Sequence, residues 1–173
     1  MLLIDEAVKN LYKSDSIPKQ LIIDFYRPGE TEPFLNISDS DYIMGETMEI
    51  DESLSSDVNI EFGSCEATQF KITLVDVEED LKDSIMSVAQ LVDGRHTIQI
   101  GTYIVQSADK QANRRYRDIV ALDFMCRFDI NVIDWYNALS FPMTLKAFRA
   151  SLCAHIGVTE EVPDNIPNDD MTV

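Results

Sequence analysis

The side chains best suited to nucleophilic or acid–base chemistry in this sequence belong to two histidines and three cysteines. His96 follows the turn signal Asp93-Gly94-Arg95 and is expected to be exposed, whereas His155 is expected in the last turn of a helix, where the helix dipole favours a cation. Cys153 precedes His155 by two positions, and residues two apart on a helix point in different directions. The spacing therefore does not favour a Cys–His nucleophile pair.

The cysteines also lack the spacing of a disulfide framework or a zinc site. Cys65, Cys126 and Cys153 are odd in number and widely separated along the chain. We expect all three to be small buried hydrophobic residues in a protein made in a reducing cytoplasm.

Other motifs that carry chemistry do not occur. The sequence has neither a Gly-x-Ser-x-Gly nucleophile turn nor a glycine-rich phosphate loop. The acidic runs Asp39-Ser40-Asp41 and Asp76–Asp83 offer oxygen ligands, but neither has the glycine and distal glutamate of an EF-hand loop, so both are expected to be solvated loops. The sequence thus predicts no catalytic, cofactor-binding or metal-binding residue, and the chain is not expected to be an enzyme.

Net charge is the extreme feature of the composition, because 14 basic residues against 31 acidic ones leave −17. Such a chain repels phosphates and anionic membrane surfaces, so no direct nucleic-acid binding is expected. Membrane insertion is not expected either, since no run of 18 apolar residues is present. The one basic concentration is expected to pair with acidic surface of this chain or of a neighbouring subunit. It consists of Lys110, Arg114, Arg115 and Arg117.

A short helix is expected at the start of the chain, over residues 4–13, where apolar side chains recur at helical spacing. A helix of this length is unstable alone, so its apolar stripe must dock on this chain or on a neighbouring subunit. The candidate subunit-interface residues are therefore Val8 and Leu11 on this helix, together with Arg114 and Arg115.

Short strands are expected to position the remaining residues. Pro28-Gly29 and Asp93-Gly94 are turn signals between strand-like runs and predict two hairpins, whereas residues 107–115 are expected to be a polar connection. One run, Ser84–Val92, is compatible with a helix as well as a strand. The expected strands are Lys19–Tyr26, Pro33–Ile37, Thr47–Leu54, Val58–Phe62, Phe70–Val75, Ser84–Val92, Thr97–Val105 and a strand centred on Ile119–Leu122.

Helices are expected again near the end of the chain. A turn or short helix is expected around Trp135, and a longer helix begins after the capping residue Thr144 and ends at Gly157. On the longer helix, Lys146 and Arg149 are expected to face water.

The expected fold class is mainly β (α+β), because no alternation of strands and helices indicates a parallel sheet. Short antiparallel strands are expected to form barrel- or sandwich-like sheets, with an N-terminal helix and a C-terminal helix. The expected organisation is an N-terminal helical arm over residues 1–16, a β-domain over 17–107 and a second, truncated α+β region over 108–173.

Nine stretches along nearly the whole chain carry a further pattern through their order and spacing. They are Ile17–Ile23, Ile37–Ile43, Met48–Leu54, Ile60–Ala67, Ile100–Val105, Ala121–Met125, Phe141–Leu145, His155–Gly157 and Ile166–Met171. Together they resemble the hub proteins at the tail tip, or baseplate, of phages and prophages of Gram-positive bacteria, including the N-terminal region of tail-associated lysins.

This resemblance implies a virion structural protein that is made in the bacterial cytoplasm and ends in the tail tip. Such hubs are commonly trimers that close the distal end of the tail tube and contact the distal tail protein and the tape measure protein. In that family the chain continues with further modules, so a continuation after Val173 is expected, and any lytic activity would lie there.

Two other functions remain open at this point. One is a soluble adaptor that binds a protein partner by strand addition or helix docking. The other is a wall-degrading enzyme component, which requires a cleft that brings His96 or His155 together with acidic residues. The hub hypothesis adds its own expectation, namely acidic residues on one concave face past which DNA slides.

Overall fold

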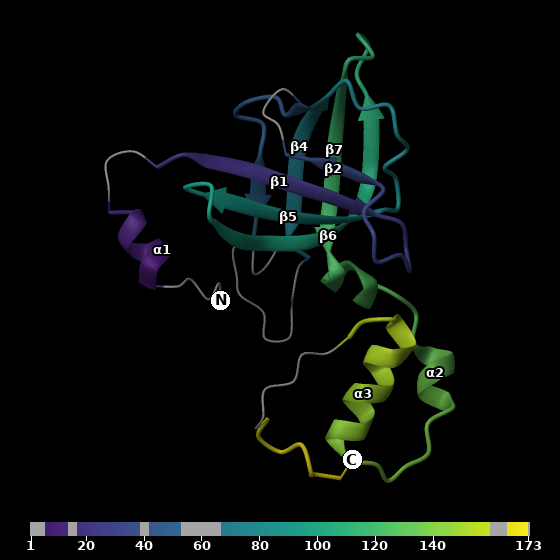
Figure 1. Cartoon of the computed structure of the whole chain (residues 1–173). Coiled ribbons are helices and arrows are strands. Elements are labelled where there is room, and N and C mark those ends of the chain that lie inside the picture. Colours follow the sequence, from purple (N-terminus) through teal and green to yellow (C-terminus); the bar gives the residue numbers. More distant parts are fainter. Residues whose placement is uncertain (1–5, 14–16, 39–41, 53–66, 160–165, 173) are drawn as a thin grey trace, which may run out of the picture. The chain divides into compact units, whose positions relative to one another are not determined.

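The computed structural model describes residues 6–13, 17–38, 42–52, 67–159 and 166–172, and it divides the chain into two compact units. Unit 1 spans Met1–Asp123 and unit 2 spans Phe124–Val173 (Figure 1). The expected boundary at 107/108 falls inside one strand of unit 1, so the strand that follows it belongs with the sheet rather than with the C-terminal region.

Unit 1 is built on one antiparallel sheet of seven strands in the order β2-β1-β5-β6-β7-β4-β3. The mainly β class is therefore confirmed. The strands are β1 (Lys19–Tyr26), β2 (Leu35–Ile37), β3 (Glu49–Asp51), β4 (Gln69–Val75), β5 (Ile85–Val92), β6 (His96–Lys110) and β7 (Tyr116–Asp123).

Both expected hairpins are present, and each turn has the backbone that its glycine permits. Gly29 has a φ of 86°, and the Glu30 N–H donates to the Arg27 carbonyl over 3.0 Å, which closes the turn between β1 and β2. Asp93 and Gly94 both have positive φ, the arrangement that matches the twist of a tight hairpin, and they connect β5 to β6.

The sheet curves around a single apolar core. Irregular pairing between Val105 and Ser107 on β6, and between Val88 and Ala89 on β5, bends the strands. In Figure 1, β1 and β5 run across β4 and β7, and side chains from all four strands belong to one buried cluster. This cluster contains Ile23, Phe25, Ile37, Phe70, Ile72, Leu74, Val77, Leu81, Met86, Val88, Tyr103, Val105, Ile119 and Ala121.

The expectation of a barrel- or sandwich-like arrangement needs correction, because the sheet is open. β2 and β3 form its two ends, and both are only three residues long. Short edge strands limit the length of unpaired backbone that a sheet presents to other chains.

β6 is longer than the sequence pattern indicates, which corrects the expected polar connection at 107–115. Its last residues pair with β7, with Ala108 opposite Ile119 and Lys110 opposite Arg117. Polar residues fit there because this end of the hairpin extends toward solvent. Only one face of an antiparallel hairpin has to be buried, so side chains on its other face can stay in water. The true connection begins only after Lys110.

Unit 2 is helical. The 3₁₀ helix η2 (Phe124–Phe128) leads to α2 (Ile133–Asn137) and α3 (Leu145–Ile156). The Thr144 hydroxyl accepts the Ala147 N–H over 3.2 Å at the start of α3, and Gly157 ends the helix with a φ of 70°, so both predicted caps are confirmed.

Arg149 does not face water, as the helical pattern had indicated. Its guanidinium forms a two-point ion pair with Asp169, and the Lys146 N–H donates to the Asp169 carbonyl over 3.0 Å. Residues far apart in sequence therefore hold the C-terminal segment 166–172 against α3. Thr144 and Thr172 complete this attachment through an isolated antiparallel bridge.

The N-terminal helix is present as α1 (Glu6–Leu11) and ends two residues before the predicted position 13, whereas positions 4 and 5 lie outside the described residues. The strand predicted over Val58–Phe62 lies outside the described residues.

Candidate functional site

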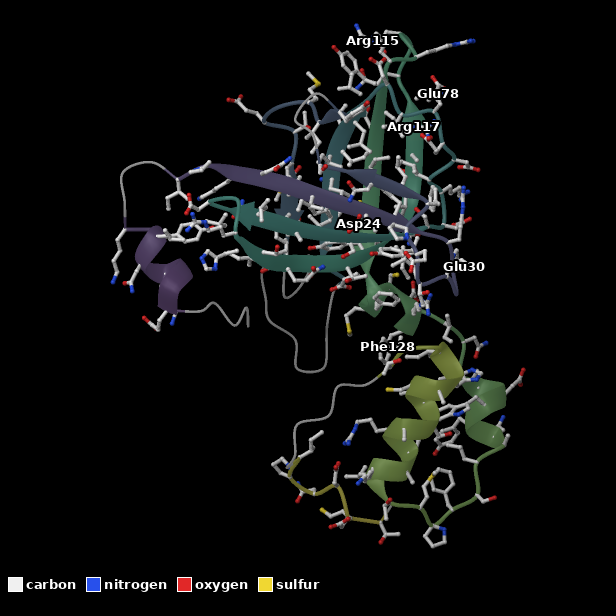
Figure 2. The ribbon with its side chains drawn as sticks, in the orientation of Figure 1. Asp24, Glu30, Glu78, Arg115, Arg117 and Phe128 are labelled. Carbon is white, nitrogen blue, oxygen red and sulfur yellow. The ribbon has the colours of Figure 1, made fainter. Side chains whose placement is uncertain are left out.

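The basic residues around the β6–β7 turn pair with the acidic loop between β4 and β5. The Lys110 ammonium lies 2.5 Å from the Glu78 carboxylate, and the Arg115 guanidinium binds both oxygens of Asp76 at 3.1 and 2.8 Å. The sequence left open whether the basic residues pair with this chain or with a neighbouring subunit. In the structure, Lys110 and Arg115 pair with an acidic loop of this chain. Figure 2 shows Arg115, Arg117 and Glu78 at the same end of the sheet.

Arg117 holds the main chain of the same loop. Its side chain comes from β7, the residue is only 5% exposed, and the guanidinium donates to the carbonyl oxygens of Glu78 and Glu79. Arg27 donates to the Asp80 carbonyl over 3.0 Å from the far side of the loop. These arginines hold the backbone of the loop by donating to three of its carbonyl oxygens. We call residues 76–83 and their basic partners the clamped loop.

The ion pairs shift the titration of the groups that form them. Hydrogen bonding from Arg115 holds the pKa of the Asp76 carboxyl below its ordinary value, and the pKa of Arg115 rises in return. Hydrogen bonding from Lys110 likewise lowers the pKa of Glu78. Both carboxylates are exposed, so solvent screens these interactions and each pair contributes modestly.

The four candidate interface residues are not brought together in one site by contacts among the described residues. Arg115 is occupied by Asp76, whereas Arg114 is exposed at the β6–β7 turn with a φ of 59°. Leu11 is half-buried at the end of α1, and the side chain of Val8 lies outside the description.

The end of α1 has contacts within its own chain. The Tyr12 hydroxyl donates to the Gln90 side chain over 2.8 Å, and the Lys19 ammonium lies 4.3 Å from the Tyr12 ring centre. Both contacts place the helix end near β1 and β5. Docking on the same chain therefore accounts for this end of the helix.

Among the described residues, the histidine and cysteine side chains suited to nucleophilic or acid–base chemistry do not come together in one site. His96 is half-buried, whereas the exposed His155 ring stacks on Trp135 with 5.8 Å between ring centres. Cys126 and Cys153 are partly exposed rather than buried as expected, and Cys65 lies outside the described residues. Among the described residues, no group of three or more histidine, cysteine or acidic side chains is arranged to hold a metal ion.

Unit 2 presents a large share of the exposed apolar surface. Ile156 is its one buried apolar residue among those described, against sixteen in unit 1. On α2, Ile133 is 62% exposed and Tyr136 52%, and the Tyr136 ring contacts Phe141 with 5.7 Å between ring centres. Together with these three, the exposed large hydrophobic residues of unit 2 are Met125, Phe128, Ile130 and Met171.

A cavity of about 320 Å³ lies at the β2 end of the sheet in unit 1. The backbone and side chains of β2, the exposed Tyr42 and the first residues of the clamped loop line it. The sequence pattern gave no sign of this cavity, because its walls come from segments about 40 residues apart in the chain.

Comparisons with known proteins return no matching family model, curated protein or solved structure. The tail-hub hypothesis therefore continues to rest on the nine stretches of the sequence. Within the described part of the chain, no helix combines the length and the apolar character needed to cross a bilayer.

Proposed function

We propose that this chain is a structural subunit of a phage or prophage tail tip, a baseplate hub protein that closes the distal end of the tail tube and scaffolds attached proteins. The observation that carries the proposal is the surface of unit 2, where seven large hydrophobic side chains are exposed and one apolar residue is buried. The order of the nine resembling stretches supplies the identity of the assembly.

The exposed side chains of unit 2 favour a buried role in an assembly. Full burial of a large apolar side chain stabilises by about 1.5–3 kcal/mol relative to exposure, so leaving several in water forgoes a sizeable free energy. Monomeric soluble proteins rarely expose large contiguous apolar patches. Ile133, Tyr136 and Phe141 lie close together, because the first two are one helical turn apart and the rings of the last two are in contact.

In this proposal the partners are further copies of the chain, in a trimer, and the distal tail and tape measure proteins. The chain is made in the bacterial cytoplasm and is incorporated into the virion tail tip. It carries no catalytic role of its own.

Particle association tests the proposal. Tail particles would be purified from cells that express an epitope-tagged full chain in its native genetic context, and the tag would be located by immunoblotting and electron microscopy. We expect the tag at the distal tail tip. An Ile133→Ser/Tyr136→Ser double variant should lose incorporation, whereas Met44→Ser, which changes an exposed methionine of unit 1, should retain it. A tagged chain found only in the particle-free fraction would refute the hub role.

The adaptor function remains the second candidate, because β2 presents an edge beside a cavity. An adaptor would bind its partner equally well in cells that make no tail particles. The hub would be found with tails.

A further inference from the structure

All three residues of β2 line the cavity described above. β2 pairs with β1 through Leu35, Asn36 and Ile37, and across the described residues no strand pairs with its other side. An unpaired edge presents backbone N–H and C=O groups that can pair with another extended chain. We call this edge, with Tyr42, Asp76, Val77 and Glu79, the β2 groove.

The far wall of the groove is held in place before any partner arrives. Val77 and Leu81 anchor the loop in the core, and Arg117 and Arg27 bind its carbonyl oxygens from β7 and from the end of β1. A wall that is already ordered loses little conformational entropy on binding.

Charge identifies what the groove would accept. Two carboxylates line it, and Asp76 is already neutralised by Arg115. The exposed Glu79 side chain has no ion pair or hydrogen bond within the described part of the chain, although its backbone carbonyl is bound by Arg117. A cation on a partner would pair with Glu79, and the exposed ring of Tyr42 would favour the same charge.

We propose that the β2 groove binds an extended segment of a partner protein in which an apolar residue stands next to a lysine or arginine. The segment would add a strand to β2, place its apolar side chain between β2 and Val77, and direct its cation to Glu79. The cavity is near the lower end of the range of roughly 300–1,000 Å³ found for ligand pockets, a size that suits one or two side chains. The chain's charge of −17 would also accelerate encounter with a basic segment.

This inference does not rest on the proposed function. The groove lies in unit 1, whereas the hub proposal is carried by unit 2, and both a hub and an adaptor bind proteins. Failure of peptide binding would not affect the test of particle association. Failure of particle association would likewise not affect the test of peptide binding.

The test uses the full chain and a fluorescein-labelled peptide of alternating lysine and valine, with a peptide of alternating glutamate and valine as its charge-reversed counterpart. Fluorescence anisotropy at 0.1 M salt should show binding of the lysine peptide alone. Glu79→Gln should raise its Kd about two- to fivefold, the effect expected for one exposed ion pair. Amide shifts in ¹⁵N spectra should change at Leu35–Ile37 and Val77–Glu79.

Asp93→Asn is the matched control, because it also removes one exposed carboxylate from unit 1. Asp93 follows Val92, which pairs with Lys19 at the opposite end of β1 from the residues that pair with β2. The Kd of the Asp93→Asn variant for the lysine peptide should equal that of the unchanged chain. Equal weakening by both variants, shift changes that avoid β2, binding of the glutamate peptide with similar affinity, or no binding at millimolar peptide would each overturn the proposal.

Discussion

Arg117 is the residue whose role depends most on its surroundings. Its charge would suit a surface position, yet it is nearly buried on β7 and donates to two carbonyl oxygens of the loop after β4. Its Nε atom is buried without a hydrogen-bond partner in the described structure. The guanidinium therefore stabilises the loop through its terminal nitrogens, while its Nε–H stays unsatisfied.

Replacing Arg117 with methionine should destabilise unit 1. Methionine keeps much of the side-chain volume but cannot donate to the carbonyl oxygens of Glu78 and Glu79, and a hydrogen bond from a charged group contributes about 1.5–3 kcal/mol. We expect the free energy of unfolding to fall by about 2–3 kcal/mol in urea titrations. Arg114→Met, at the exposed turn, should change it by less than about 0.5 kcal/mol. Equal stability of the two variants would show that Arg117 does not hold the loop.

A second prediction for a single residue concerns Gly101. A Cβ atom at this position would lie 2.5 Å from the Tyr103 hydroxyl oxygen, because the Tyr103 ring folds back over the glycine. Tyr103 is itself fixed against Phe70 in the core, with 5.0 Å between ring centres. Gly101→Ala should therefore lower the free energy of unfolding by about 1–3 kcal/mol through overpacking.

Gly45→Ala is the control for this substitution, since nothing lies within 4 Å of the added Cβ there. Its stability in the same urea titration should be unchanged or slightly higher. If Gly101→Ala is as stable as Gly45→Ala, the Tyr103 ring is not fixed over the glycine.

At the scale of elements, the clamped loop is stabilised by groups that titrate in acid. The pKa values of Asp76 and Glu78 are lower in the folded chain than their ordinary values of 3.8 and 4.5. A carboxylate whose pKa falls on folding stabilises the fold above its unfolded-state pKa and loses that contribution as the pH falls through the folded-state value. The contribution of these pairs is therefore complete at neutral pH, and it declines as the pH falls below about 4 toward the lowered folded-state values.

Arg115→Gln should make this pH dependence visible. The variant lacks the partner of Asp76, so it should unfold at a lower urea concentration than the unchanged chain at pH 6. The difference between the two midpoints should shrink as the pH falls below about 4 and Asp76 becomes protonated in both proteins. Arg114→Gln removes the same charge from the neighbouring residue and should give a pH-independent difference. A pH-independent gap for Arg115→Gln as well would contradict the pairing.

At the scale of the whole molecule, the two units differ in how much core they have. Sixteen of the seventeen buried apolar residues in the described structure belong to unit 1. A chain that ends at Asp123 should therefore keep its sheet and unfold cooperatively, whereas residues 124–173 alone should not. Circular dichroism of the two fragments during thermal unfolding checks this. A cooperative transition for 124–173 would show that unit 2 is stable without further burial.

The distribution of charge over unit 1 corrects one expectation of the hub hypothesis. The inner face of its curved sheet is filled by the apolar core, so it cannot be the acidic concave surface that was expected. Exposed carboxylates lie instead in turns at different ends of the sheet, among them Asp93 and the loop that begins at Asp76. Carboxylates scattered in this way argue against the acidic channel wall that the hub hypothesis predicted.

Local sequence predicted the elements wherever a local cause sets them. β1 begins and ends at the predicted residues, and the two hairpin turns and both caps of α3 follow from residue types that tolerate or require those backbone conformations. The extent of β6 was not predictable in this way, because its last polar residues are held by pairing with β7. Arg149 was misplaced for the same reason, since its partner Asp169 is 20 residues away.

The mainly β class, the turns, the helix caps and the strong negative charge could be predicted without a structure, because they depend on neighbouring residues or on composition. The open sheet, the pairing of the basic cluster with the acidic loop of its own chain, and the cavity beside β2 could not be predicted in this way. These features join residues distant in sequence. The free energy of each such contact depends on which surfaces pack together in the folded chain, and local sequence patterns do not specify that packing.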